Sequence, residues 1–192
     1  MGAWTQAEQI RQTDPRWASV LMGRSSVSNI GDYGCLMASF GMLCGRTPAQ
    51  INTLATANGG YQSAPGREAY AATFNVRQII GSDQAPELLD AGTGEYPFSP
   101  YPLHLIKRLV AHLRMGHPAT IRVDAFPGRP GDQTHYVLGV AAYGPANAAH
   151  LAQIVINDPA YGDQVLLAAR YGLTLERALV HAIYYRGEYV YG

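Results

Sequence analysis

The 192-residue sequence has no excess of charge of either sign, because its 14 basic and 14 acidic side chains cancel and charged residues make up only 15% of the chain. Without a basic stripe to neutralise phosphates, we expect no nucleic-acid partner. Apolar runs are short, such as residues 166–169, whereas a helix that crosses a bilayer needs about 20 apolar residues, so we expect no membrane-spanning segment. No basic stretch followed by an apolar one marks a signal peptide, which favours a cytoplasmic protein or one released by a non-classical route.

Cysteine is scarce as well, since only Cys35 and Cys44 are present. They fall in one helix-like stretch and would be separated by about 13 Å of axial rise, whereas a disulfide requires Cα atoms within about 7 Å. The sequence therefore predicts two separate thiols. No pair of cysteines or histidines has zinc-ligand spacing, and the glycine clusters lack the lysine of a phosphate-binding loop. We expect neither a metal nor an organic cofactor.

Hydrophobic residues are plentiful and make up 47% of the sequence, and glycine (21), tyrosine (13) and proline (12) are frequent. This composition supplies a packed core with many turns, and the length suits one domain. We expect a single domain over residues 1–192, in which residues 1–11 form an irregular N-terminal extension.

Three helices are indicated in the first two thirds of the chain. Residues 35–43 are small and apolar, which predicts a buried helix that begins at or just before its first residue and ends near Gly45. The Thr-Pro-Ala-Gln sequence at 47–50 is a helix start, and the Asn-Gly-Gly sequence at 58–60 should stop that helix. Apolar residues at helical spacing predict a third helix over 103–115. Further expectations are a short helix at 67–73, a strand at 75–80 and irregular chain over 1–34 and 84–102.

Beyond residue 115 the apolar pattern changes to a period of two, which predicts strands joined by turns. The expected strands are 119–123, 134–142, 153–157, 164–167 and 182–190. Because the helices come first and the strands follow, the sequence predicts an α+β fold with an antiparallel sheet.

Cys35 follows Gly34 at the N-terminal end of the first predicted helix. Unpaired backbone N–H groups and the positive end of the helix dipole stabilise an anion at this position, which favours a reactive thiolate. The alternative is that Cys35 only packs in the core. Cys44 lies at the opposite end of the helix, where the dipole disfavours a thiolate, and we interpret it as a core residue.

His135 is the histidine best placed to act as a base for this thiolate. It lies near the start of the run 134–140, where an alternating strand emerges from a loop, so the sheet would hold the ring rigidly at a cleft. We interpret the other five histidines as surface or core residues: His104, His112, His117, His150 and His181.

The dipeptide of Asn157 and Asp158 ends the next predicted strand, just before a proline. If this strand is the antiparallel neighbour of the strand that bears His135, the Asp158 carboxylate can accept the imidazole N–H and fix its tautomer. Asn157 is the alternative third member of such a triad. An Asn-Asp-Pro sequence is also a common turn, so the dipeptide alone does not separate the two interpretations.

Together these segments resemble the C39-like cysteine peptidases of the papain-like superfamily, in particular their bacterial and phage members. The segments that carry the resemblance are 12–17, 31–39, 47–52, 58–61, 134–138 and 156–162. The likeness extends from about residue 12 to residue 190 and implies a papain-like fold, in which a helix bearing the cysteine packs against an antiparallel sheet. It also implies that Cys35 is the nucleophile, His135 the general base and acid, and Asp158 the orienting residue.

The sequence departs from this family at the position of the oxyanion donor. Such enzymes usually carry a glutamine about six residues before the nucleophile, and here that position is Asn29. Asparagine can donate the same amide N–H from a shorter arm. The departure is equally consistent with weakened catalysis, since one lost donor costs about 10²–10³ in rate.

The function implied by the resemblance is hydrolysis of a peptide or related amide bond through an acyl-enzyme on Cys35. Two alternatives stay open: a papain-like binding or structural module without turnover, and a lytic enzyme that cleaves cell-wall peptides with the same triad. The expected partner is a peptide or a cell-wall peptide, and the sequence does not predict an oligomeric state.

Overall fold

The computed structural model describes residues 8–57, 61, 87–89, 103–126, 134–144, 154–172 and 181–184. In chain order the elements are α1 (Ile30–Tyr33), α2 (Cys35–Cys44), α3 (Pro48–Ala57), β1 (Glu87–Leu89), α5 (Leu103–Arg114), β2 (Ala119–Asp124), β3 (Thr134–Ala142), β4 (Ile154–Asp158), β5 (Asp163–Leu166), α6 (Leu167–Tyr171) and β6 (His181–Tyr184). Within these residues, no helix is both long and apolar enough to span a bilayer.

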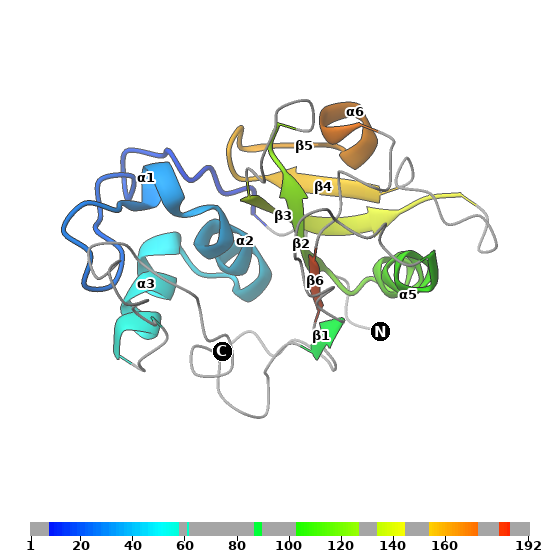
Figure 1. Ribbon diagram of the computed structural model, residues 1–192, viewed down its shortest axis with the longest axis horizontal. Coiled ribbons are helices and arrows are strands. Elements are labelled where there is room, and N and C mark those ends of the chain that lie inside the picture. Colours follow the sequence, from blue (N-terminus) through cyan, green and yellow to red (C-terminus); the bar gives the residue numbers. More distant parts are fainter. Residues whose placement is uncertain are drawn as a thin grey trace.

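The strands form one sheet in the order β1-β6-β2-β3-β4-β5, and every pair is antiparallel. Strands β2 to β5 are consecutive neighbours, as expected for strands joined by turns, and β6 and β1 extend the sheet beyond β2. The N-terminal helices pack against this sheet (Figure 1). The predicted α+β fold with an antiparallel sheet is therefore confirmed.

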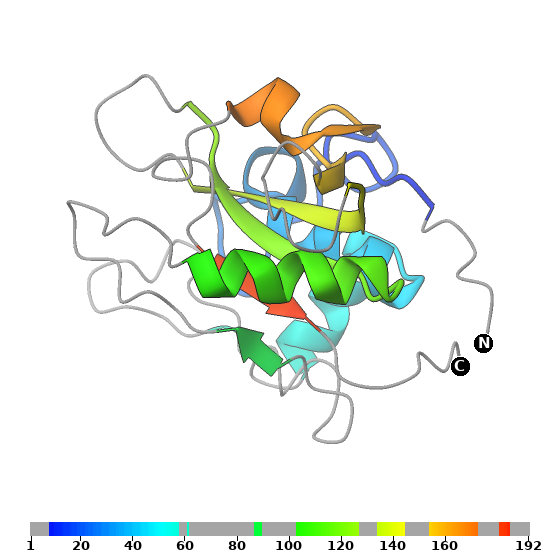
Figure 2. The same ribbon diagram turned by 90° about the vertical axis from the view of Figure 1, so that its right-hand side faces the viewer.

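The sheet separates two hydrophobic cores. Helices α1 to α3 lie on one side and α5 covers the other (Figure 1), so that α5 lies in front of the sheet in the turned view (Figure 2). Because side chains alternate along a strand, neighbouring residues of β3 enter different cores. Val137 belongs to the core beneath α5, whereas Leu138 packs with Met37 and Phe40 of α2. Helix α2 is thus held firmly against the strand that carries His135.

The three main helices form where the sequence predicts them. Helix α2 begins at Cys35 and ends at Gly45, whose φ of 62° is the left-handed conformation that glycine adopts readily. Helix α3 starts with the predicted capping box, in which the backbone N–H of Thr47 donates to Gln50 Oε1 and the N–H of Gln50 donates to Thr47 Oγ1. Helix α5 ends one residue before the predicted limit.

Three short elements correct the sequence prediction. Helix α1 lies within the segment predicted to be irregular, because Asn29 caps it through an N–H of Asp32. Strand β1 lies within the predicted loop 84–102 and is stabilised by pairing with β6. Helix α6 was not predicted, although good helix formers followed by Gly172 mark it. The helix expected at 67–73 and the strand expected at 75–80 lie outside the described residues.

Residues 8–11, which belong to the expected N-terminal extension, form neither helix nor strand. The segment is nevertheless fixed to the domain. Ile10 is buried in the core around α2, and the backbone carbonyl of Arg11 accepts a hydrogen bond of 3.0 Å from the indole of Trp17. The ordered fold therefore includes at least the end of this extension.

Candidate active site

Cys35 is the first residue of α2 and is half-buried. Its N-terminal neighbour Gly34 ends α1 and donates its backbone N–H to the carbonyl of Ile30. A Cβ atom on residue 34 would collide with that carbonyl oxygen and with the Ile30 side chain, so only glycine fits between the two helices. No side chain caps the start of α2. The thiol therefore sits at the positive end of a ten-residue helix, as the sequence predicts.

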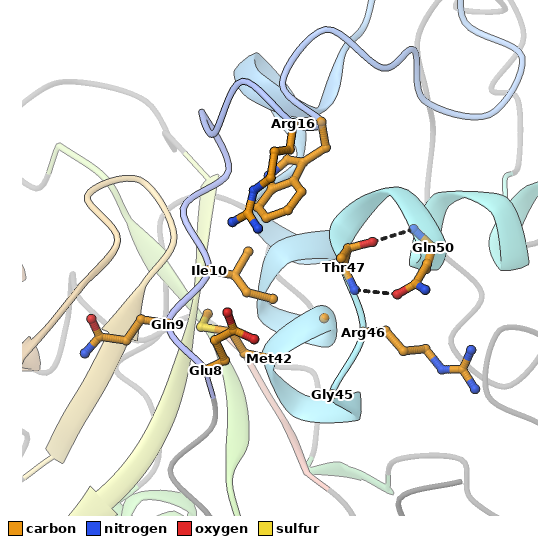
Figure 3. A pocket seen from close by; sticks show the side chains of 11 residues that line it. Glu8, Gln9, Ile10, Arg16, Met42, Gly45, Arg46, Thr47 and Gln50 are labelled. Atoms are coloured by element: carbon orange, nitrogen blue, oxygen red, sulfur yellow. Dashed lines mark hydrogen bonds between the residues drawn. The ribbon is translucent and has the colours of Figure 1, made fainter.

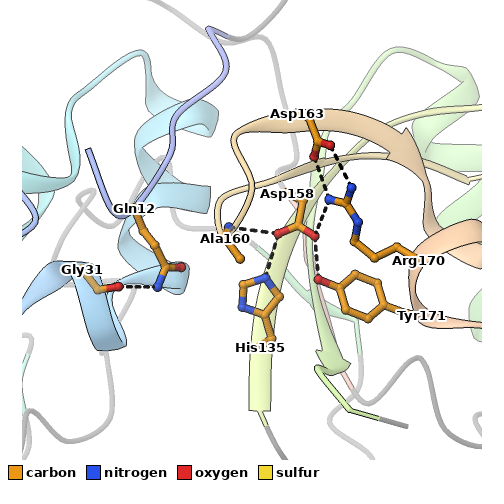
Figure 4. Close-up of polar contacts among 8 residues, drawn as sticks. All are labelled: Gln12, Gly31, His135, Asp158, Ala160, Asp163, Arg170 and Tyr171. Carbon is orange, nitrogen blue, oxygen red and sulfur yellow. Dashed lines mark hydrogen bonds and ion pairs between the residues drawn. The ribbon is translucent and has the colours of Figure 1, made fainter. Parts of the chain in front are cut away.

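His135 and Asp158 come from adjacent antiparallel strands. His135 is the second residue of β3 and Asp158 is the last residue of β4, and the register of the two strands brings these ends together. Nε2 of His135 lies 2.9 Å from Oδ1 of Asp158, and both side chains are almost completely buried. The expected hydrogen bond between the predicted base and its orienting carboxylate is therefore present (Figure 4).

The charges of this pair are set by its surroundings. Burial by itself raises the pKa of Asp158, but hydrogen bonds from His135, Tyr171 and Arg170 outweigh it and hold the pKa at about 2. Burial by itself lowers the pKa of His135, but the hydrogen bonds and charges of Asp158 and Cys35 raise it to about 9. At neutral pH the site therefore favours an ionised carboxylate and a protonated imidazole.

Cys35 lies close enough to His135 for its side chain to raise the pKa of the imidazole. An ionised carboxylate only accepts hydrogen bonds, so Nε2 of the imidazole carries a proton and donates it to Asp158. Nδ1 is then the ring nitrogen left for the thiol. The structure thus places Cys35, at the start of α2, near the hydrogen-bonded pair of His135 and Asp158.

Asn157, the alternative third member, is placed elsewhere. Its side chain is buried and its Oδ1 accepts a hydrogen bond of 2.9 Å from Gln164 on β5. Alternation along β4 puts neighbouring side chains on opposite faces of the sheet, so Asn157 and Asp158 cannot both face His135. The geometry therefore favours Asp158 over Asn157 as the residue that orients His135.

Asn29, the predicted oxyanion donor, is engaged in capping α1. Its Oδ1 accepts the backbone N–H of Asp32 at 2.9 Å, and its Nδ2 donates to the Asp32 carboxylate at 2.8 Å. Asp32 therefore holds both ends of the carboxamide, and one N–H of Nδ2 remains outside these two bonds. The oxyanion role of Asn29 stays a prediction.

Gln12 is a site residue that the sequence reasoning missed. Its backbone N–H donates to the carbonyl of Pro159, directly after Asp158, and its Nε2 donates to the carbonyl of Gly31, four residues before Cys35. The side chain is buried, and within the described part of the chain its Oε1 has no hydrogen-bond partner. Gln12 therefore bridges the helical side and the sheet side of the site (Figure 4). The sequence feature that could have identified Gln12 is its position in the segment 12–17, which carries part of the family resemblance.

Helix α6 supplies two more residues that the sequence reasoning missed. Tyr171 donates its hydroxyl to Oδ2 of Asp158 at 2.6 Å, and Nη1 of Arg170 donates to the same oxygen at 3.1 Å. Figure 4 shows both side chains converging on the carboxylate oxygen that does not bond to His135.

A pocket of about 140 Å³ lies at the other end of α2, next to the N-terminal segment (Figure 3). Gly41, Met42 and Gly45 contribute to its wall, so the pocket is about a helix length away from Cys35. Cys44 is half-buried against the core on the same end of the helix, and the structure contains no disulfide between the two cysteines. Across the described ranges, no group of three or more metal-ligating side chains could hold a metal ion.

Comparisons of the chain with models of protein families, with curated proteins and with solved structures gave no match.

Proposed function

We propose that this protein is a papain-like cysteine hydrolase that cleaves a peptide or related amide bond through an acyl-enzyme on Cys35. The observation that carries the proposal is the position of His135. It is hydrogen-bonded to the buried carboxylate of Asp158 and interacts with the thiol at the start of α2. A thiol at a helix N-terminus, a base within reach and a group that orients the base are the three parts that nucleophilic catalysis needs.

In the proposed reaction, the Cys35 thiolate attacks the carbonyl carbon of the substrate and forms a C–S bond. The imidazolium of His135 then gives the proton on Nδ1 to the leaving amine as the C–N bond breaks, which leaves the acyl-enzyme. His135 next takes a proton from water, whose oxygen attacks the thioester carbonyl. The acid product leaves, and the thiolate and imidazolium are restored. Asp158 holds the ring in place throughout.

Gln12 is the side chain best placed to stabilise the oxyanion. One N–H of its amide is bonded to Gly31, which fixes the group next to the loop that leads to Cys35. The second N–H of Nε2 is then available to an oxygen that develops negative charge, together with the backbone N–H of Cys35. The side chain is buried, its amide is held at Gly31 and its backbone at Pro159, so little reorganisation is needed when that charge appears.

The reactivity of Cys35 towards iodoacetamide as a function of pH tests the proposal. Cys44 is the internal control, because both cysteines are half-buried and differ mainly in their position on α2. We expect Cys35 to label rapidly at about pH 6, where an ordinary thiol with a pKa of about 8.5 reacts slowly. The rapid phase should disappear in His135→Ala.

Equal and slow labelling of the two cysteines would remove the nucleophile and favour a binding module without turnover. If Cys35 is reactive, digestion of a mixed peptide library and of purified peptidoglycan, each followed by mass spectrometry, separates a general peptidase from a lytic enzyme. The inactive Cys35→Ala variant is the control for both substrates.

A further inference from the structure

The Asp158 carboxylate accepts hydrogen bonds from three donors in addition to His135. Oδ1 accepts from His135 and from the backbone N–H of Ala160 at 3.0 Å, and Oδ2 accepts from Tyr171 at 2.6 Å and from Arg170 at 3.1 Å. The carboxylate itself is completely buried. Its orientation is therefore fixed on both oxygens, and a cation lies directly against its charge.

Arg170 is itself held in position by two further residues. Its Nη1 and Nη2 donate to the two carboxylate oxygens of Asp163 at 2.6 and 2.8 Å, a bidentate pair. Its guanidinium also lies 4.1 Å from the ring centroid of Tyr161. Since the Arg170 side chain is 20% exposed and that of Asp163 is 46% exposed, the pair links the surface to the buried Asp158.

We propose that Arg170 is a positioning residue, which fixes the Asp158 carboxylate towards His135 and neutralises part of the negative charge of Asp158. Asp163 weakens this neutralisation, because it shares the guanidinium of Arg170. The importance of Arg170 and Asp163 for catalysis rests on the function proposed above. The charges alternate in sign from each group to its neighbour, in the order Asp163, Arg170, Asp158, His135 and Cys35. Each charge therefore modifies the proton affinity of the next group.

The direction of the effect follows from the groups that face the carboxylate. His135 on β3 and both Arg170 and Tyr171 on α6 contact the carboxylate directly. Behind them lie Cys35 on α2 next to His135, and Asp163 on β5 and Tyr161 in the turn between β4 and β5, both next to Arg170. Among the described residues around the carboxylate, only Arg170 adds positive charge besides the imidazolium. Removing that charge leaves two carboxylates to stabilise the imidazolium, whereas removing the charge of Asp163 has the opposite effect.

The test is a pH titration of the His135 ring by NMR in the full-length protein, compared among single variants. We expect Arg170→Met to move the His135 midpoint upward by about one pH unit, a tenfold change in proton affinity. Asp163→Asn should move it downward by a smaller amount. Arg170→Lys keeps the charge and should stay closer to the wild type than Arg170→Met.

Arg16→Met is the matched control, because Arg16 also forms a bidentate pair with an aspartate, Asp14, and lies over an aromatic ring, that of Trp17, but has no contact with Asp158. It should leave the His135 titration unchanged. Shifts of opposite sign in the Arg170 and Asp163 variants cannot come from a general loosening of the fold. Should Arg170→Met fail to fold, the downward shift in Asp163→Asn still decides the question.

The outcomes also separate this proposal from the proposed function. If Cys35 is reactive towards iodoacetamide but neither variant moves the His135 midpoint, the hydrolase stands and the role of Arg170 is refuted. If the midpoints move in the expected directions but Cys35 reacts like Cys44, the positioning role stands and the hydrolase is refuted.

Discussion

The imidazole of His135 and the carboxylate of Asp158 are 2.9 Å apart although the residues are 23 positions apart in the chain. Antiparallel pairing of β3 with β4 accounts for this distance, because the start of one strand lies beside the end of the next. The position of the pair at one end of two central strands also places it where the N-terminus of α2 meets the sheet.

Asp158→Asn should lower kcat/KM by about 10²- to 10⁴-fold. In its four described hydrogen bonds the carboxylate is the acceptor, with two donors on each oxygen. An amide NH₂ group in place of either oxygen would therefore face a donor, either at His135 or at Arg170. Steady-state kinetics with the substrate found by library digestion would measure the loss.

Asn157→Ala provides the comparison for that variant. It removes a buried hydrogen bond to Gln164, so we expect a less stable protein whose kcat per folded molecule is close to that of the wild type. An active Asp158→Asn variant together with an inactive Asn157→Ala variant would transfer the third role to Asn157.

Gln12→Ala should lower kcat by about 10²–10³ with little change in KM, because an oxyanion donor acts in the transition state. Asn29→Ser is the matched variant. Serine still caps α1 but has no amide N–H, so we expect activity close to that of the wild type. The reverse result, with Asn29→Ser impaired and Gln12→Ala active, would restore the oxyanion role to Asn29.

The raised pKa of His135 predicts a loss of stability at alkaline pH. Burial opposes protonation, but the partners Asp158 and Cys35 raise the pKa from 6.5 to about 9. A folded-state pKa above the unfolded value stabilises the protein fully below pH 6.5, and this contribution is lost as the pH rises through about 9. Urea unfolding at closely spaced pH values would show the decline. In His135→Gln this part of the decline should be absent, and an unchanged decline would contradict the assignment.

His112 predicts a separate loss of stability in acid. Burial, and next the charge of nearby His117, lower its pKa from 6.5 to about 4, while a backbone hydrogen bond at Pro118 opposes them. A folded-state pKa below the unfolded value gives a contribution that is complete above pH 6.5 and is lost as the pH falls through about 4. His112→Leu should flatten the dependence of the unfolding free energy on pH in this window. The ring of His112 stacks on His117 at 4.9 Å, so His117→Asn should flatten it less.

Much of the site could be predicted from local sequence. Small apolar residues after Gly34 indicated a helix beginning at Cys35, and the alternation of β3 and β4 indicated where His135 and Asp158 would emerge. These predictions depend on periodicity and on helix termini, which are properties of a few neighbouring residues. They therefore needed no knowledge of how the elements pack.

Gln12, Arg170 and Tyr171 illustrate what local sequence could not provide. Gln12 lies in an irregular segment and reaches the site only because its backbone bonds to Pro159 and its amide to Gly31. Arg170 and Tyr171 lie on a five-residue helix too short to show a periodic pattern. Asn29 was assigned by its distance from Cys35 in the sequence, and only the structure shows that its amide bonds to Asp32, three residues further on.

The sequence by itself determined that helices come first and strands follow. It also determined which helix start carries the thiol and which strand ends carry His135 and Asp158. The tertiary structure alone decided which of Asn157 and Asp158 faces the imidazole, which amide bridges the two sides of the site, and which donors surround the buried carboxylate. The reason is physical: periodicity along the chain fixes a side chain's face, whereas hydrogen-bond partners depend on strand register and on contacts between residues far apart in the sequence.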